Sequence, residues 1–122
     1  MIAGNGIDII EIHRIAEAIK NEHFSSRVFT GEELVQTKQQ SHRLAGFFAA
    51  KEALLKAMGT GLSNFSWQEM EIRHNAKGAP YFEVSGKVKK FLMEMNISQI
   101  HLSISHCREY AVAQVILEKE QG

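Results

Sequence analysis

Apolar residues recur along this chain at two spacings, and each spacing predicts a type of element. Residues 2–12 are rich in β-branched side chains and predict a strand, in which Gly4 and Gly6 allow another backbone to come close. Apolar positions at helical spacing predict a short helix at residues 14–21 and a long helix at residues 41–58. The long helix carries an apolar stripe that we expect to face the core: Leu44, Phe47, Phe48, Leu54, Leu55 and Met58.

Capping and turn residues set the predicted boundaries. The run Thr-Gly-Glu-Glu at residues 30–33 fits a capping box, so a helix should begin there. Ser41 is the expected N-cap of the long helix and Gly59 its end, while Ser85 should cap a helix at residues 86–95. Strands are predicted at residues 67–73, 81–84, 99–105 and 110–118, with a turn at residues 75–78. Helices early in the chain and mostly antiparallel strands late predict an α+β fold, with antiparallel strands packed on helices.

Composition narrows the possible functions. At 122 residues we expect a single domain, 1–122. The formal net charge of zero argues against general binding to nucleic acid, which needs a net basic face. The sequence has no apolar run near about 18 residues and no signal peptide, so we expect no membrane association and a cytoplasmic location. Cys107 is the only cysteine, which excludes an internal disulfide and a zinc site built from several thiolates.

Two acidic residues lie in unexpectedly apolar surroundings. Asp8 interrupts the β-branched run, although aspartate is a poor strand residue. Glu52 lies on the long helix among alanines, with Lys51 before it and Lys56 one turn later. A buried charge is unfavourable unless it is paired or bound to a metal. The two carboxylates, with lysines near them, therefore indicate a site for a hard cation and a polyphosphate.

The sequence of the long helix allows two interpretations of Glu52, as a metal ligand or as one partner of an ion pair. Ala45, Ala49 and Ala53 share a stripe with Glu52 and Lys56, and small side chains there let something come close to the carboxylate. Glu52 and Lys56 can also form an i, i+4 ion pair on a solvated face. Such a pair stabilises a helix by a few tenths of a kcal/mol and needs no function.

Two further segments allow a structural or a functional interpretation. Gly59, in the run Gly-Thr-Gly at residues 59–61, can simply end the helix, or the N–H groups of the loop can hold a phosphate. Residues 101–106 alternate polar and apolar side chains, which is typical of a strand with one solvated face, and their imidazoles and hydroxyls can equally donate to a nucleotide. The chain has no Gly-x-Ser-x-Gly elbow for a serine triad. His101 and His106 would lie on opposite strand faces, which disfavours a shared zinc ion.

Six segments together resemble the 4′-phosphopantetheinyl transferase family, and specifically its short bacterial type, the holo-[acyl-carrier-protein] synthases. Each segment is weak alone, but they occur in the family's order and cover nearly the whole chain. They are residues 6–14 (GIDIIEIHR), 27–30 (RVFT), 44–53 (LAGFFAAKEA), 56–61 (KAMGTG), 75–80 (NAKGAP) and 101–106 (HLSISH).

The resemblance implies the phosphopantetheinyl transferase fold and a reaction of fatty acid biosynthesis. The 4′-phosphopantetheine group of coenzyme A moves to a serine of apo acyl carrier protein, and adenosine 3′,5′-bisphosphate leaves. By similarity, Asp8 and Glu52 hold Mg²⁺ at the pyrophosphate of coenzyme A, and Lys56 adds positive charge there. Either Glu52 or a metal-bound water accepts the serine proton, and the sequence does not choose between them. Weaker candidates for coenzyme A contacts are Lys51, Gly59, Thr60, Gly61 and His106.

The sequence departs from the family at one position of the implied site. The residue before Phe48 is usually an arginine in the family, and here it is Phe47. Arg43 lies one helical turn earlier on about the same face, so we expect it to replace part of that charge at the phosphates of coenzyme A.

The resemblance also implies protein partners. Acyl carrier proteins are acidic, so we expect a docking surface that includes Arg14, Lys20 and Arg27. The short family members assemble as trimers whose active sites are shared between neighbours. A homotrimer agrees with the last predicted strand, because its apolar residues cannot all face one core: Val112, Val115, Ile116 and Leu117.

Two other functions stay open. A protein of this fold can bind acyl carrier protein or a nucleotide without transfer, and the departure at Phe47 keeps that alternative open. A Mg²⁺-dependent phosphohydrolase would use water in place of the serine. Incubation with coenzyme A, Mg²⁺ and apo carrier protein distinguishes all three.

Overall fold

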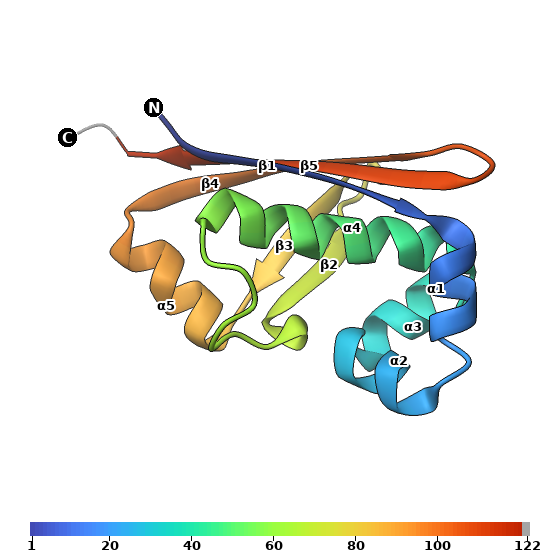
Figure 1. Ribbon diagram of the computed structural model, residues 1–122. Coiled ribbons are helices and arrows are strands. Elements are labelled where there is room, and N and C mark those ends of the chain that lie inside the picture. Colours follow the sequence, from blue (N-terminus) through green and yellow to red (C-terminus); the bar gives the residue numbers. More distant parts are fainter. Residues whose placement is uncertain (121–122) are drawn as a thin grey trace.

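One sheet and one long helix form the centre of the protein. The computed structural model describes residues 1–120. Strands β1 (Ile2–Glu11), β5 (Tyr110–Lys119) and β4 (Ile97–His106) form an antiparallel sheet in the order β1-β5-β4. Helix α4 (Ser41–Met58) runs along one face of this sheet (Figure 1). Among residues 1–120, no helix covers the opposite face.

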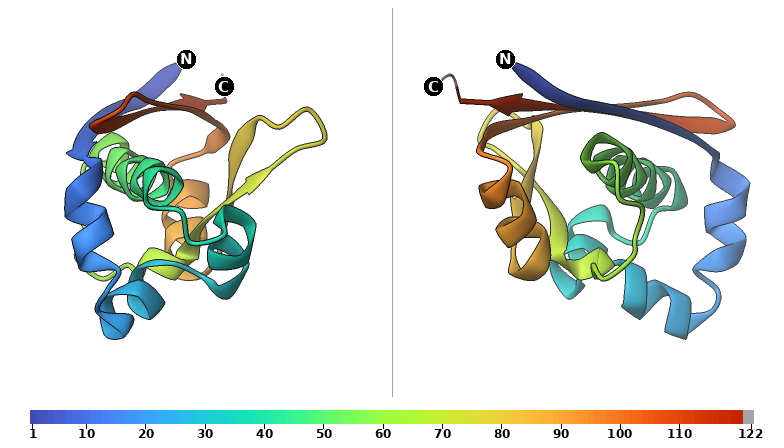
Figure 2. Two further views of the ribbon diagram at one scale, coloured as in Figure 1. Left: turned by 90° about the vertical axis from the view of Figure 1, so that its right-hand side faces the viewer. Right: turned by 60° about the vertical axis from the view of Figure 1, so that its left-hand side comes forward.

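The remaining elements surround α4. Helices α1 (Ile12–Ala18), α2 (Glu22–Val28) and α3 (Gly31–Thr37) lie toward its N-terminal end. A second antiparallel pair, β2 (Met70–His74) and β3 (Pro80–Val84), follows the 3₁₀ turn η1 (Trp67–Glu69) and precedes α5 (Gly86–Glu94). The left view of Figure 2 looks along α4 and shows α1 on one side of it and the β2–β3 hairpin on the other. This arrangement confirms the predicted α+β fold.

Small residues let β1 lie directly on α4. A Cβ atom at Gly6 would collide with the carbonyl oxygen of Ala53, so only glycine permits this approach. Ala45, Ala49 and Ala53 are fully buried beneath the sheet. The small side chains that we expected to let something come close to Glu52 thus admit strand β1.

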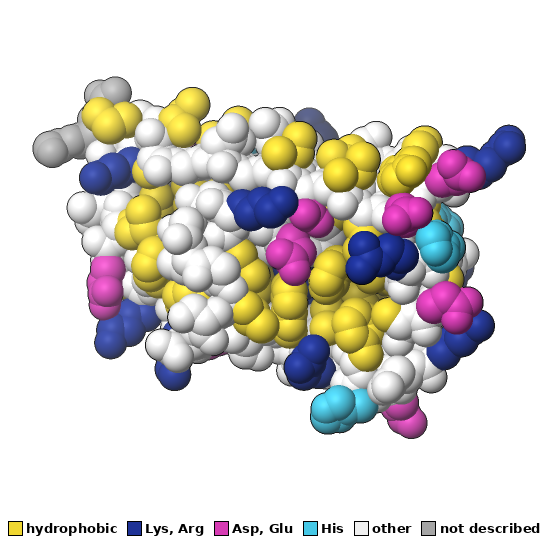
Figure 3. Space-filling model, viewed as in Figure 1, with side chains coloured by type: hydrophobic (Ala, Val, Ile, Leu, Met, Phe, Trp, Pro, Cys, Tyr) yellow, Lys and Arg dark blue, Asp and Glu magenta, His cyan; other side chains and the backbone are white. Residues whose placement is uncertain are grey.

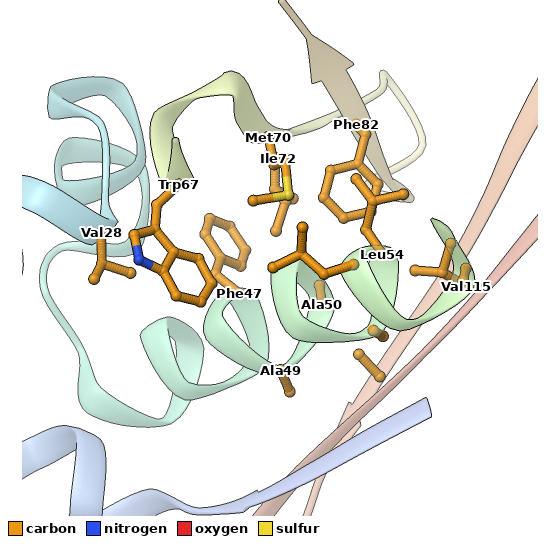
Figure 4. Close-up of a cluster of buried hydrophobic side chains, with 14 of the residues drawn as sticks. Val28, Phe47, Ala49, Ala50, Leu54, Trp67, Met70, Ile72, Phe82 and Val115 are labelled. Atoms are coloured by element: carbon orange, nitrogen blue, oxygen red, sulfur yellow. The ribbon is translucent and has the colours of Figure 1, made fainter. Parts of the chain in front are cut away.

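The apolar stripe of α4 packs against the β2–β3 hairpin. Figure 4 shows Phe47 and Leu54 directed toward the hairpin, whereas Ala49 points away from it. The hairpin and its flanks contribute buried side chains to this contact, among them Met70, Ile72 and Phe82. The predicted core stripe is confirmed except at Phe48, which is only half-buried. Within the described part of the chain, no helix has both the length and the apolar character needed to cross a membrane.

The predicted helix ends are confirmed at the start of α3 and at Gly59, the C-cap of α4; Ser41 was wrong, and Ser85 is right in position only. The capping box predicted at residues 30–33 is present at the start of α3. Ser41 is the first helical residue of α4 and not its N-cap. Ser85 occupies the N-cap position of α5 but gives no side-chain hydrogen bond. There the Lys87 N–H donates to Glu69 Oε2 at 2.6 Å, so a residue distant in the sequence caps this helix.

Two predicted segments differ from the structure in extent. The helix expected at residues 14–21 begins at Ile12 and ends at Ala18. The helix α2 was not predicted, because Phe24 and Val28 are its only large apolar residues and give no clear period. The first part of the strand expected at residues 67–73 is the turn η1.

The face of the sheet that points away from α4 is partly apolar. Along β5, Val115 and Leu117 are buried against α4. Because successive side chains of a strand alternate between its two faces, Ile116 points to the opposite face of the sheet. That uncovered face carries Ile7, Ile9, Val112 and Ile116. The apolar residues of the last strand therefore divide between two faces, as predicted.

Candidate functional site

Two carboxylates meet where β1 crosses α4. Asp8 lies on the face of β1 that is turned toward the helix, and Glu52 lies on α4 below it. Both side chains are partly buried. Figure 3 shows acidic side chains next to a basic one at the centre of this face, with an apolar area below them. The close packing of β1 on α4 thus creates an acidic site from residues far apart in the sequence.

Lys56 pairs with Asp8 and not with Glu52. Its Nζ donates to Asp8 Oδ1 at 2.9 Å and to the carbonyl oxygen of Ile7 at 3.0 Å. Among residues 1–120, no ion pair joins Glu52 to Lys56. The simple i, i+4 pair that the sequence left open is therefore absent, and the ammonium group lies at the strand instead.

The site disfavours the charged form of Glu52 relative to the neutral form. Burial raises the pKa of Glu52 above its usual value, the negative charge of Asp8 raises it further, and Lys56 opposes both effects. No group of three or more His, Cys, Asp or Glu side chains with the geometry of a metal site occurs within residues 1–120. The site thus offers two carboxylates to a cation, and water or a bound ligand would fill the other coordination positions of that cation.

Lys51 has a structural role that the sequence did not reveal. Its side chain is fully buried, and Nζ donates to Glu33 Oε1 at 2.7 Å and to the carbonyl oxygens of Val28 at 2.8 Å and Trp67 at 3.3 Å. These three acceptors match the three donors of an ammonium group. The suggestion that Lys51 contacts coenzyme A was wrong, because the side chain points into the core.

Arg43 and His106 lie together in a different part of the molecule. They line a cavity of about 510 Å³ between the N-terminal half of α4, the end of α3, the β2–β3 hairpin and the end of β4. Phe47 also lines it, and its ring stacks on that of His74 with the centroids 5.9 Å apart. The apolar residue in the place of the family's arginine therefore forms one wall of this cavity.

The cavity and the carboxylate site lie on opposite sides of α4. Arg43 and Glu52 are nine residues apart, which is two and a half turns at 3.6 residues per turn. Their side chains consequently leave the helix in opposite directions. A single copy of the chain separates the residues expected to bind coenzyme A into two groups.

The loop after α4 begins as an ordinary helix end. Gly59 has a φ of 77°, and its N–H donates to the carbonyl oxygens of Leu55 and Lys56. The N–H of Thr60 also donates to Leu55, at 3.3 Å. Gly59 thus acts as a C-terminal cap, and a phosphate at this loop would compete with helix carbonyls for these donors.

Comparison with known proteins identifies the family. The sequence model of the 4′-phosphopantetheinyl transferase superfamily matches residues 4–115. The chain belongs to this superfamily. Holo-[acyl-carrier-protein] synthase of Alkaliphilus metalliredigens is 46% identical over 120 residues, which are 95% of this chain and 98% of that protein.

Solved structures of the family have the same fold. Holo-[acyl-carrier-protein] synthase from Neisseria meningitidis superposes with a TM-score of 0.89 at 38% identity, over 98% of this chain and 100% of that one. The enzyme from Helicobacter pylori, solved in complex with coenzyme A, gives a TM-score of 0.85 at 35% identity, over 93% and 99% of the two chains. The fold predicted from the six segments is therefore that of the family.

The basic residues expected to dock a carrier protein are exposed near α1 and α2. Arg14 lies on α1 and Arg27 on the last turn of α2. Lys20 follows α1, and its Nζ lies 3.1 Å from Glu17 Oε1, which reduces the charge it presents. All three residues are exposed cations, and because Glu17 lies beside Lys20, the two arginines present the stronger positive charge.

Sequence reasoning missed several residues that shape these sites. Glu33 was expected only to cap α3, yet it also accepts from the Ile72 N–H at 2.8 Å and pairs with Lys51. A Cβ at Gly46 would come within 2.8 Å of Ile104, so this glycine sets the approach of α4 to β4. His42 and His74, which line the cavity, carried no recognisable motif.

Proposed function

We propose that this protein transfers the 4′-phosphopantetheine group of coenzyme A to a serine of an apo acyl carrier protein and releases adenosine 3′,5′-bisphosphate. One observation carries the proposal: in a chain of this superfamily, Asp8 and Glu52 meet beside Lys56. The reaction would supply carrier protein for fatty acid biosynthesis. We place it in the cytoplasm, where an exposed free thiol such as that of Cys107 stays reduced.

The carboxylate pair fits Mg²⁺. Proteins commonly hold this ion through one or two carboxylates, and water and substrate phosphates complete its coordination. The raised pKa of Glu52 indicates that the pair lacks positive charge, which a divalent cation would provide. We therefore propose Asp8 and Glu52 as the ligands. A bound ion would polarise the attacked phosphorus and neutralise charge on the leaving group.

The side chains around the pair have further roles in the proposed reaction. The serine oxygen forms a bond to the phosphorus that carries pantetheine, and the bond from that phosphorus to the bridging oxygen breaks. The leaving adenosine 3′,5′-bisphosphate keeps the electron pair. Lys56, half-exposed beside Asp8, can turn toward the phosphates and stabilise this charge. We propose that the serine proton goes to Glu52, whose carboxylate lies at the reacting phosphorus if it holds the ion, or to a water on that ion.

We propose that each active site is shared in a homotrimer. Arg43 and His106 lie on the opposite side of α4 from Glu52, so coenzyme A reaches both groups most simply between two copies of the chain. The uncovered sheet face offers an interface, since Ile7 and Ile9 are 58% and 63% exposed there. Sedimentation tests this arrangement, and a strictly monomeric protein with full activity would contradict it.

A mass measurement on the carrier protein tests the proposed function. Coenzyme A, Mg²⁺ and apo carrier protein are incubated with the enzyme, and transfer adds about 340 Da to the carrier. Asp8→Asn and Glu52→Gln, which keep the side-chain shapes, should each lower the rate about a hundredfold or more. Glu94→Gln, an exposed change on α5, is the matched control and should keep the rate.

The same assay separates the alternatives. A phosphohydrolase consumes coenzyme A without carrier protein, and a binding module leaves both substrates unchanged. Near-normal transfer by Glu52→Gln at millimolar Mg²⁺ would remove Glu52 from the proposed metal site.

A further inference from the structure

The ammonium group at the carboxylate site is held loosely. Lys56 Nζ donates to Asp8 Oδ1 at 2.9 Å and to the carbonyl oxygen of Ile7 at 3.0 Å. Among residues 1–120 it meets no third acceptor, so one of its three N–H bonds is left for water or a ligand. The Lys56 side chain is 54% exposed, and an ion pair with such access to water is weak. Lys56 can therefore leave Asp8 at little cost in free energy.

The other lysine of α4 is held in the opposite way. Lys51 is fully buried, and three protein acceptors use all of its donors: Glu33 and the carbonyl oxygens of Val28 and Trp67. Lys56 lies in the last turn of the helix, on a flexible four-carbon stem. The fold thus fixes one ammonium group in the core and lets the other exchange between partners.

The formal charges of the site depend on Lys56. Asp8 and Glu52 together carry two negative charges, and among residues 1–120 Lys56 is the only side chain that forms an ion pair with either of them. The charge of Lys56 also reaches Glu52, since it opposes the rise in the pKa of that carboxyl. The two carboxylates alone would neutralise a divalent cation. With Lys56 beside them, one positive charge is left over, and the diphosphate of coenzyme A can offset it.

We propose that Lys56 competes with the divalent cation for Asp8 and leaves Asp8 for the diphosphate of coenzyme A, so that the cation and coenzyme A bind cooperatively. The identities of these two ligands rest on the proposed function. While Lys56 holds Asp8, its ammonium group repels a cation at the same carboxylates. A diphosphate offers Lys56 a second anionic partner, and its departure makes Asp8 available to the cation. By linkage, each ligand then raises the affinity for the other by the same factor.

Binding of Mn²⁺ alone tests the competition. Mn²⁺ shares the preference of Mg²⁺ for carboxylate and water, and electron paramagnetic resonance counts its free form. Lys56→Met removes the ammonium group and keeps the length of the side chain, so it should bind Mn²⁺ about tenfold more tightly than the wild type. Water screens the charges at a half-exposed site and limits the change to this size.

Three other variants show whether the charge of Lys56 is responsible. Lys56→Gln should bind Mn²⁺ as tightly as Lys56→Met does. Lys56→Arg keeps the positive charge and should stay within about twofold of the wild type. Lys90→Met, which removes an exposed lysine of α5, is the matched control and should keep the wild-type affinity for Mn²⁺.

Calorimetry with coenzyme A tests the exchange. The dissociation constant of coenzyme A is measured with and without saturating Mg²⁺, and the ratio of the two values gives the coupling between the ligands. In Lys56→Met this ratio should be about tenfold smaller than in the wild type, because only the direct attraction between cation and phosphate is left. The complex that Mg²⁺ forms with coenzyme A in solution contributes equally to both measurements.

The outcomes separate this proposal from the proposed function. An affinity for Mn²⁺ that is the same in Lys56→Met and the wild type overturns the competition, even if the wild type modifies carrier protein. An unchanged coupling ratio overturns the exchange in the same way. Tighter binding of Mn²⁺ together with a smaller coupling ratio supports the proposal, even if no carrier protein is modified, and in that case only the proposed transfer fails.

Discussion

The buried pair of Lys51 and Glu33 gives the sharpest prediction about stability. In Glu33→Ala the Lys51 ammonium keeps two backbone carbonyls but loses its carboxylate, with no access to water. The change also removes the acceptor of the Thr30 and Ile72 N–H groups. An uncompensated charge is thus left in the core, where α3, α4 and β2 meet.

The expected loss follows from this geometry. Removal of one partner from a buried ion pair costs about 3–5 kcal/mol. The total stability of such a domain is about 5–15 kcal/mol, so the variant should lose a large fraction of it. With a urea m-value of about 2 kcal/mol/M, a loss of about 4 kcal/mol lowers the midpoint by about 2 M.

Urea denaturation followed by circular dichroism measures this loss. Glu32→Ala, the exposed neighbour on the same helical turn, is the control and should change stability by less than about 1 kcal/mol. The double variant Glu33→Leu/Lys51→Met leaves no charge unpaired. Its loss in free energy of unfolding should therefore be about 2 kcal/mol smaller than the summed losses of the single variants Glu33→Leu and Lys51→Met. A Glu33→Ala protein within about 1 kcal/mol of wild type would refute the structural role of the pair.

Three further predictions concern the sites. The pKa of Glu52 is raised above the usual 4.5, so ionisation of this side chain destabilises the folded state as the pH rises from 4.5 through the raised pKa. Without divalent cations, Glu52→Gln should therefore raise the Tm at pH 8 but not below about pH 4. A lower Tm of this variant at pH 8 would contradict the reasoning. Phe47→Arg adds a guanidinium to the cavity wall and should lower the KM for coenzyme A about tenfold in the transfer assay, whereas Arg43→Ala should raise it; unchanged values in both would exclude a phosphate there. Arg14→Glu should slow transfer at low salt and leave the calorimetric affinity for coenzyme A unchanged, and an unaltered KM for carrier protein would exclude docking at α1.

The local elements could be predicted because their signals are local. The apolar stripe of α4, the capping box of α3 and the alternation along β4 each depend on residues within a few positions of one another. One failure occurs where a distant residue acts. Glu69, and not Ser85, caps α5, and no spacing in the sequence connects those two positions.

The residues that could carry chemistry are recognisable from the sequence alone. Asp8 and Glu52 are conspicuous as acids in apolar segments, and the six ordered segments indicate the family from the residues alone. The packing of β1 on α4 is also encoded in small residues such as Gly6. Which charges pair is visible only in the folded protein, because a pairing depends on distances between elements that are remote along the chain.

The two lysines and the one arginine of α4 illustrate that distinction. From the sequence, Lys51, Lys56 and Arg43 were all cations on one helix, and each was a candidate for the same ligand. In the folded protein, Lys51 is buried against Glu33, Lys56 reaches Asp8, and Arg43 lines a cavity on the far side of the helix. Helical periodicity gives the direction of each side chain, but the element that it meets there is fixed only when the whole chain packs.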